Sequence, residues 1–369
     1  MPGHGAGPGR PCPRSRLVAR GRLLLGGAVI ALLLPLPASA ARQLAQQPFT
    51  FAVISDTHVG RASDRARLKE AIALVNRLRP APKLLVVAGD LTDGSRPEQI
   101  RDYREILATS TVPCFDIPGN HDIGFRPSPA GTARFQRLLD HPPLPRVLTV
   151  AGRHFVGFDS MLLNTKRDPP APDDQGHAHL DALEQLLAGL PPGPIFLVTH
   201  IPPVENHVRD AARASWHTPF LLRFREILAR FPVAAILAGH FHRDELYFLG
   251  DVPLMSLPAT GSRYHIVGSV RVITHDARGI RYRQVYFGPK GLGRSYYHDL
   301  RDLDMVQHRQ ELEAASPEEL QHLWHRRYTY VPASAATFSP GKRVTTERIR
   351  TMLMAEDSPG WRLLQPVAD

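Results

Sequence analysis

The chain carries the segment Gly119-Asn120-His121-Asp122 directly after the mainly apolar run 112–118. A short strand that ends in Gly and is followed by polar residues is how an α/β sheet presents reactive groups at its carboxyl edge. Asn offers a carbonyl oxygen to a cation, His can bind a metal or donate a proton, and Asp can orient a neighbouring His. Taken alone, the tetrapeptide is also consistent with a tight turn, because Gly and Asn are ordinary turn residues.

Four other predicted strand ends carry residues of the same chemical types. They are Asp56 and His58 after 48–54, Asp90 after 83–88, His200 after 195–199, and His240 and His242 after 233–238. In Asp-x-His and His-x-His, alternate side chains lie on one side of an extended segment, so both can reach one cation. Carboxylate, imidazole and amide ligands together favour a divalent ion such as Mn, Fe or Zn. One ion cannot use all these groups, whereas two ions about 3.5–4 Å apart and bridged by a carboxylate can.

Helices are predicted between these strands. Apolar residues at helical spacing indicate a helix that begins near Ser63 and others over about 98–108, 180–187 and 219–230. Hairpins are expected at 146–150 with 154–158 and at 270–274 with 280–286. Buried strands that alternate with helices predict a mainly parallel sheet covered by helices. No Gly-x-Gly-x-x-Gly follows a strand and no Gly-Lys-Ser/Thr occurs, so a dinucleotide or phosphate-loop fold is not indicated.

Residues 1–40 have the pattern of a secretory signal peptide. Five arginines and no acids precede the apolar run 23–36, and small residues follow as far as Ala40. We expect cleavage near Ala40 and a periplasmic or secreted protein. An uncleaved membrane anchor is the alternative, because the apolar stretch nearly reaches the ~20 residues of a membrane span. Contact with a membrane is expected only through the leader, and only if the leader is not cleaved.

The rest of the chain is only mildly basic. Subtracting the five leader arginines from the net charge of +10 leaves +5, which does not indicate nucleic-acid binding. Cys114 is the one cysteine after the leader, so an internal disulfide cannot stabilise an exported fold. We expect one domain over 41–287. Beyond it, 288–369 is interpreted as a C-terminal extension that packs on this domain.

In order and spacing, these motifs resemble those of the calcineurin-like metallophosphoesterases over about 49–287, with most similarity to the bacterial branch related to class III cyclic-nucleotide phosphodiesterases. The resemblance rests on Asp56-Thr57-His58, Gly89-Asp90, Gly119-Asn120-His121-Asp122, His200-Ile201-Pro202-Pro203 and Gly239-His240-Phe241-His242. It implies an α/β fold, a four-layer α/β/β/α sandwich with mixed, largely parallel sheets. It also implies two metal positions bridged by Asp90, one completed by Asp56, His58 and His242, the other by Asn120, His200 and His240. His121 would be a general acid, oriented by Asp122.

The activity that this resemblance implies is hydrolysis of a phosphomonoester or phosphodiester. Two divalent ions would lower the pKa of a shared water and neutralise the phosphate, while His121 protonates the departing alkoxide. Because the chain is expected outside the cytosol, its small substrate is expected to be a nucleotide, a glycerophosphodiester or a lipid-linked phosphate. Glu205, Asn206, His207, Arg209 and Trp216 are expected to border it. The alternative is a non-catalytic protein that binds metal or phosphate on the same scaffold.

Overall fold

The structure is a computed structural model, and it describes residues 47–164, 173–204, 215–242, 245–261, 268–287, 295–299, 328–331 and 350–352. All of these belong to one unit of the chain, 37–369. The expected signal peptide and most of 288–369 lie outside the described residues, so the leader and the domain boundaries stay predictions. Within the described part of the chain, no helix has both the length and the apolar character needed to cross a bilayer.

The first sheet has six strands in the order β12-β11-β10-β1-β2-β3. The strands β1, β2 and β3 are parallel, whereas β10, β11 and β12 join their neighbours in antiparallel fashion. The bounds are β1 Phe49–Ile54, β2 Leu85–Ala88, β3 Cys114–Ile117, β10 Gly268–Asp276, β11 Gly279–Phe287 and β12 Ser295–Asp299. The three parallel strands therefore bring the residues after Ile54, Ala88 and Ile117 to the same edge.

The second sheet has eight strands in the order β14-β13-β8-β9-β7-β6-β5-β4. Its central strands β5, β6, β7 and β9 are parallel, and β4 and β8 pair antiparallel with β5 and β9. The bounds are β4 Arg146–Val150, β5 Arg153–Gly157, β6 Ile195–Val198, β7 Val233–Ala238, β8 Glu245–Leu249, β9 Val252–Ser256, β13 Tyr328–Val331 and β14 Arg350–Met352. Through β12, β13 and β14, short pieces of the 288–369 region extend both sheets.

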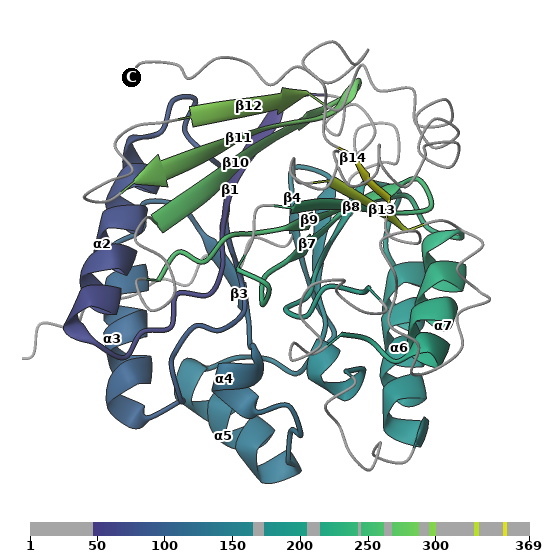
Figure 1. Cartoon of the computed structure of the whole chain (residues 1–369), viewed down its shortest axis with the longest axis horizontal. Coiled ribbons are helices and arrows are strands. Elements are labelled where there is room, and N and C mark those ends of the chain that lie inside the picture. The colour runs from purple at the N-terminus through teal and green to yellow at the C-terminus, as the bar shows by residue number, and fades with distance from the viewer. Residues whose placement is uncertain are drawn as a thin grey trace, which may run out of the picture. The chain divides into compact units, whose positions relative to one another are not determined.

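Helices cover the outer faces of the two sheets (Figure 1), with α2 and α3 on the first sheet and α6 and α7 on the second. The bounds are α2 Ala62–Arg77, α3 Pro97–Leu107, α4 Asn120–Ile123, α5 Pro129–Leu139, η1 Ser160–Leu162, α6 Asp173–Ala188 and α7 Thr218–Leu228. The predicted α/β/β/α sandwich is confirmed. Helix α5, which the sequence patterns did not predict, begins where Ser128 Oγ accepts the Gly131 N–H at 3.0 Å.

The start of α2 differs slightly from the prediction. Ser63 was expected to cap the helix, but the helix begins at Ala62 and the cap is Arg61. The carboxylate of Asp64 accepts the Arg61 N–H at 2.9 Å, and an acid in the first turn also complements the helix dipole. A carboxylate three residues after the cap thus replaces the expected serine hydroxyl.

Apolar side chains fill the space between the sheets. Phe51 from the first sheet meets Phe155 and Phe196 from the second, with ring centroids 5.0 Å apart in both pairs. All three rings are fully buried, and each contributes about 1.5–3 kcal/mol relative to an exposed ring. This packing fixes the two sheets against each other, and so fixes the positions of the polar residues at their carboxyl edges.

Candidate metal centre and active site

Four buried side chains from both sheets form one cluster at this edge. The ligand atoms of Asp56, His58, Asp90 and His242 all lie within 4.8 Å of one another. His242 Nε2 is 3.1 Å from Asp56 Oδ1 and 3.3 Å from His58 Nε2. His58 Nε2 is 3.7 Å from Asp90 Oδ2. The residues predicted for the first metal position therefore come together, two strand ends from the first sheet and one from the second.

Residues predicted for the second position also gather at Asp90. His200 Nε2 is 3.3 Å from Asp90 Oδ2 and 3.1 Å from Asn120 Oδ1. The His200 Nδ1–H donates to the Ala88 carbonyl at 3.0 Å, so Nε2 is the ring nitrogen that faces these oxygens. The His240 ring lies 5.2 Å from the His200 ring, centroid to centroid. Asp90 is the residue that both groups share.

The backbone at these strand ends is in an uncommon conformation. Asp56, His58, Asp90, His240 and His242 all have φ between 44° and 68°. This left-handed region costs about 1–3 kcal/mol for a residue other than Gly, although Asp, Asn and His tolerate it best. Strain at five of the seven predicted ligands indicates that the surrounding structure holds them in place for function.

Two positions at this edge must be glycine, because neighbouring atoms leave no room for a Cβ. A Cβ on Gly119 would lie 2.2 Å from Asp90 Oδ1, and a Cβ on Gly239 would lie 1.9 Å from Ser55 Oγ. The φ of Gly119 is −117°, a value that any residue can adopt. Gly119 is therefore needed because Asp90 packs against its Cα, and not because of its turn geometry.

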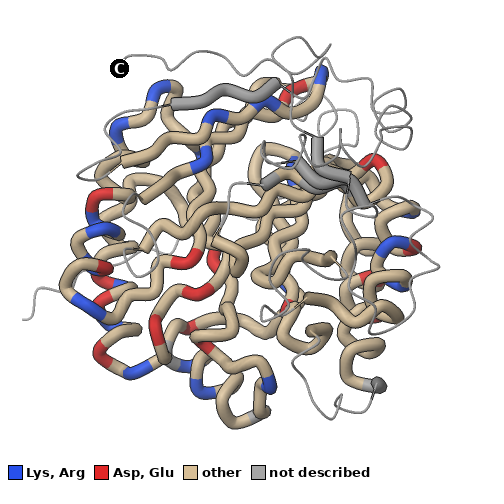
Figure 2. Tube along the Cα trace, in the orientation of Figure 1, with Lys and Arg blue, Asp and Glu red and all other residues tan. Residues whose placement is uncertain are grey.

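The chemistry of the donor set fits divalent cations. Ring nitrogens of His58 and His242 lie close to Asp56, and His200 Nε2 lies close to Asn120 and Asp90, so a cation can replace the protons that these contacts share. Burial acts to lower the pKa of His200, but the carboxylates of Asp90 and Asp56 outweigh it and raise this pKa to about 9. Figure 2 shows acidic positions near the centre of the view, while Lys and Arg lie mostly on helices and outer strands.

The two carboxylates are anionic at this site. Burial acts to raise the pKa of Asp56 and of Asp90, but neighbouring imidazoles, chiefly His242 for Asp56 and His200 for Asp90, hold both pKa values well below the usual range. Burial lowers the pKa of His58 to about 4, against the opposing effect of the two carboxylates. A neutral imidazole beside two carboxylates is the state in which a histidine binds a metal.

His121 lies beside this cluster, half-buried, and Asp93 holds its ring. His121 Nδ1 is 3.2 Å from the Asp93 carbonyl oxygen and 3.4 Å from the Asp93 carboxylate. Its ring stands at 88° to the His58 ring, with centroids 4.6 Å apart. With Nδ1–H donated to Asp93, Nε2 is the nitrogen available to a reacting oxygen. Asp93 was missed in the sequence, where the available signal was a second Asp three residues after Asp90.

The prediction that Asp122 orients the His121 ring is wrong. The Asp122 carboxylate accepts the Gly119, Leu91 and Thr92 N–H groups and the Thr92 hydroxyl, each at 2.9 Å. Burial and the nearby Asp90 raise the pKa of Asp122 to about 6, while the backbone donors oppose this rise. Asp122 therefore ties the loop after β2 to the start of α4, and positions Asp90 and His121 only through the backbone.

The expected border of the substrate site is only partly described. Residues 205–209 lie outside the described residues. Trp216 was expected at this border, but it is fully buried, and its Nε1–H donates to the Ile201 carbonyl at 2.9 Å. The sequence did not indicate Phe125, whose half-buried ring lies 5.8 Å from the His240 ring.

The family model described as calcineurin-like phosphoesterase matches residues 49–244, which include every residue of the metal cluster. The chain belongs to this family. Membership identifies it as a hydrolase of phosphoric ester bonds, and confirms the resemblance seen in the motifs.

Individual members of the calcineurin-like phosphoesterase family are only distantly similar. A 3′,5′-cyclic-nucleotide phosphodiesterase of Nostoc sp. is 24% identical over 253 residues, which cover 65% of this chain and 88% of that protein. The 3′,5′-cyclic adenosine monophosphate phosphodiesterase CpdA of Escherichia coli is 28% identical over 222 residues, covering 56% and 74%. Among solved structures, GAP50, the anchor in the inner membrane complex of Plasmodium, is 14% identical with a TM-score of 0.48, covering 66% of this chain and 86% of that one.

Proposed function

We propose that the chain is an exported phosphodiesterase that works with two divalent metal ions and uses His121 as its general acid. The observation that carries the proposal is the convergence of carboxylate, imidazole and amide groups around Asp90, with His121 held beside them by a residue outside that set. The metals would be Mn, Fe or Zn, because these ions accept mixed nitrogen and oxygen ligands.

The chain's own residues would divide the work as follows. Asp56, His58 and His242 would hold one ion, Asn120, His200 and His240 the other, and Asp90 both. When bound, the ions supply a water of lowered pKa and neutralise the phosphate charge. His121, whose Nδ1 lies against Asp93, presents Nε2 to the leaving oxygen and protonates it. The donor is the doubly protonated ring, which keeps its Nδ1–H on Asp93 and gives up the Nε2 proton.

The substrate proposal is a phosphodiester of a small molecule. The support for this substrate class comes from relatives that are named as phosphodiesterases of small molecules. They include the cyclic-nucleotide phosphodiesterases above and a probable glycerophosphodiester phosphodiesterase of Arcobacter nitrofigilis, which is 24% identical over 199 residues. Export would favour extracytoplasmic nucleotides, glycerophosphodiesters or lipid-linked phosphates. The candidate site has no basic cluster that suggests nucleic acid as the substrate within the described residues.

The decisive experiment combines metal analysis with hydrolysis of two model esters. Protein purified after export is loaded with Mn or Zn, and its metal content is measured. Turnover of bis-p-nitrophenyl phosphate is then compared with that of p-nitrophenyl phosphate. We expect two ions per chain and faster hydrolysis of the diester. Faster hydrolysis of the monoester would reassign the substrate class. Two bound ions with no hydrolysis of either ester would favour the alternative, a non-catalytic protein that binds metal or phosphate on this scaffold.

Export has its own test. Expression of the full chain in a bacterial host should yield periplasmic protein whose N-terminus, read by mass spectrometry, starts at or near Ala41. A membrane-bound product that keeps residues 1–40 would show instead that the leader is an anchor.

A further inference from the structure

The Ser55 hydroxyl lies beneath the candidate metal centre, in contact with one of the predicted ligands. Ser55 follows β1 directly, precedes Asp56 and is fully buried. Its hydroxyl donates to Asp56 Oδ2 at 2.6 Å, the distance of a charge-assisted hydrogen bond. The same oxygen lies 2.9 Å from the Ala88 carbonyl. A hydroxyl carries one proton, so the carboxylate, as the stronger acceptor, takes the larger share of it.

Backbone contacts from two sides fix the position of this hydroxyl. The Ser55 carbonyl accepts the Thr260 N–H at 2.8 Å, which holds the main chain of Ser55 in place. On the side of the second sheet, the Cα of Gly239 packs directly against Ser55 Oγ, because a Cβ at this position would overlap that oxygen. The hydroxyl is therefore preorganised towards Asp56 before any ion binds.

The two carboxylate oxygens of Asp56 have different surroundings. Oδ2 accepts the Ser55 hydroxyl, and the His240 N–H lies 3.1 Å from both oxygens. Oδ1 faces the imidazoles of the cluster, at 3.1 Å from His242 Nε2 and 3.9 Å from His58 Nε2. Each carboxylate oxygen offers about two acceptor sites, and the hydrogen bonds to Oδ2 use those that an ion would otherwise take. Oδ1 is thus the oxygen that Asp56 presents to an ion.

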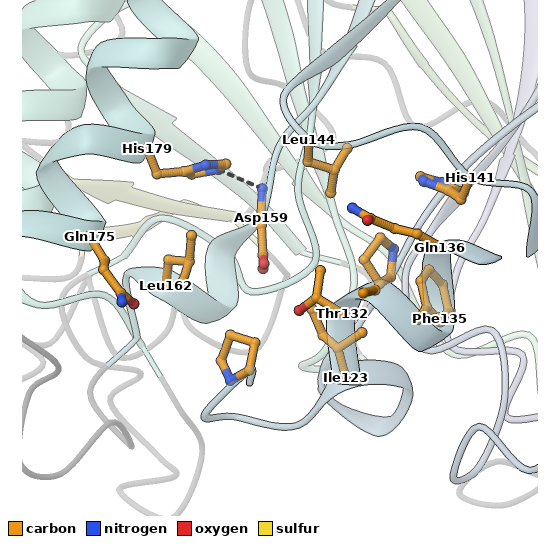
Figure 3. A pocket seen from close by; sticks show the side chains of 13 residues that line it. Ile123, Thr132, Phe135, Gln136, His141, Leu144, Asp159, Leu162, Gln175 and His179 are labelled. Atoms are coloured by element: carbon orange, nitrogen blue, oxygen red, sulfur yellow. Dashed lines mark hydrogen bonds between the residues drawn. The ribbon is translucent and has the colours of Figure 1, made fainter. Parts of the chain in front are cut away.

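The acid at the end of β5, Asp159, is held in another way. Its Oδ1 accepts the Met161 N–H at 2.8 Å, a contact within its own loop. Figure 3 shows its side chain on the wall of a cavity of about 320 Å³, whose described lining includes none of the predicted metal ligands. The residue before it is Phe158, which has no hydroxyl. An acid at a strand end can therefore be fixed without a preceding serine, so the contact from Ser55 is a particular feature of the metal centre.

The Ser55 hydroxyl also touches a support of the second metal position. The Ala88 carbonyl that lies 2.9 Å from Ser55 Oγ accepts the His200 Nδ1–H at 3.0 Å. Asp56 and His200 are predicted to bind different ions, so one hydroxyl contacts the supports of both. Its effect on the second position should be the smaller, because the bond between His200 and Ala88 does not need the hydroxyl.

We propose that Ser55 is a positioning residue of the metal centre, whose hydroxyl holds Asp56 Oδ2 so that Oδ1 alone binds the ion. The inference rests on the two-metal centre of the proposed function, but it does not depend on hydrolysis. A hydrogen bond to a ligating carboxylate fixes its orientation, and loss of such a partner lowers metal affinity by about 10–100-fold. Because Ser55 is fully buried, its role passes through Asp56 and not through contact with a substrate.

The variant Ser55→Ala tests this role. It leaves no contacted acceptor without a donor, because Asp56 keeps the His240 N–H and the Ala88 carbonyl keeps the His200 Nδ1–H. The two dissociation constants for Zn are measured on the full chain by competition with a chromophoric chelator. We expect one constant to rise about tenfold or more and the other to change less.

The matched control is Thr57→Val. The Thr57 hydroxyl is also fully buried and donates to the Leu91 carbonyl at 2.6 Å, and that carbonyl keeps the Val59 N–H in the variant. Each variant loses one buried hydroxyl hydrogen bond of the same length, so both should lower the urea midpoint of the metal-free chain. Thr57→Val should leave both dissociation constants unchanged. Equal metal affinity in the two variants would refute the role of Ser55.

A crystal structure of the Zn-loaded unchanged chain is the independent measurement. We expect Asp56 Oδ1 on the ion and Oδ2 on the Ser55 hydroxyl. An ion bound through both oxygens of Asp56, or through Oδ2, would overturn the proposal even if Ser55→Ala does not fold. Two bound ions with such an Asp56 would refute the role of Ser55 alone. An unchanged chain that binds no ion would refute the metal centre, and the role of Ser55 with it.

Discussion

The end of β5 differs from the ends of β1, β2 and β7, although each carries a buried acid or histidine to the carboxyl edge of its sheet. Asp159 after β5 has φ −92° and ψ 103°, an ordinary extended conformation. Asp56, Asp90 and His240 after the other three strands are all left-handed. Among these four strand ends, the left-handed conformation therefore occurs at the three whose residues are predicted to bind metal, and the end of β5 has a relaxed backbone.

Hydrogen bonds between loops hold the left-handed residues at the ends of β1, β2 and β7 in place. The Asp56 N–H donates to the Gly89 carbonyl at 3.0 Å, and the His58 N–H donates to the Asp90 carbonyl at 2.9 Å. The His240 N–H, from the other sheet, donates to the Asp56 carboxylate at 3.1 Å. Because each loop depends on the next, a change at one predicted ligand should disturb the others. A side chain at the end of β5 can be changed with less effect on its surroundings.

The largest effect is expected for Asp90→Ala. Asp90 lies against both His58 and His200, so its loss should remove the shared ligand and leave neither ion tightly bound. We expect turnover of the diester to fall by about a thousandfold or more, equivalent to several kcal/mol of transition-state stabilisation. The measurement is metal content by mass spectrometry alongside turnover. A variant that keeps two ions would show that Asp90 does not bridge them.

The next effect concerns His121→Ala. His121 is not among the predicted ligands, so the variant should retain both ions while its turnover falls by about a hundredfold or more, the usual contribution of a general acid. The loss should be smallest for p-nitrophenyl diesters, whose leaving group needs no proton, and should grow for phenyl and alkyl leaving groups. An equal loss across this series, or loss of metal, would contradict the role of proton donor.

A smaller effect is expected for Asp93→Asn. If Asp93 fixes the His121 ring, this variant should lower turnover by about tenfold, keep both ions and shift the basic limb of the pH–rate profile. Asp102→Asn is the matched control, because Asp102 lies on the surface of α3 in an ion pair with Arg65 at 3.4 Å. An unchanged pH profile in Asp93→Asn, with turnover equal to that of the control, would remove Asp93 from the mechanism.

The contrast between Asp93 and Asp122 shows where sequence reasoning succeeded and where it did not. The strand ends could be predicted, because a buried apolar run followed by polar residues marks the edge of a sheet. The partner of His121 could not. Neighbouring residues such as His121 and Asp122 do not face each other in a helical turn, and the turn α4 was not foreseen. Asp93 reaches His121 only because the loop after β2 lies beside α4.

Other parts of the fold were out of reach for related reasons. Helix α5 contains Gly131 and begins with Pro129 and Ala130, a pattern that local propensity does not distinguish from a loop. Trp216 was placed at the substrate border because it lies in the segment between His200 and the next predicted strand, but it is buried between Phe158 and Phe224. The strain at the predicted ligands is likewise invisible in the sequence, since Asp and His occur in every backbone conformation.

The smallest effect is expected for His179, which contacts the end of β5 by accepting the Asp159 N–H. Burial lowers the pKa of His179 to about 4, below the ordinary value near 6.5 of the unfolded chain. Its contribution to stability is therefore complete above about pH 6.5 and is lost as the pH falls towards 4, by at most about 3 kcal/mol. Protonation would also put a hydrogen on Nε2, which accepts the Asp159 N–H. His179→Gln should thus make the free energy of unfolding less dependent on pH between 7 and 4.5 in urea titrations.

The control is His177→Gln. His177 lies on the same helix with its ring against Phe220, and its replacement should keep the pH dependence of the unchanged chain. Identical slopes for both variants would mean that His179 is not the group that titrates.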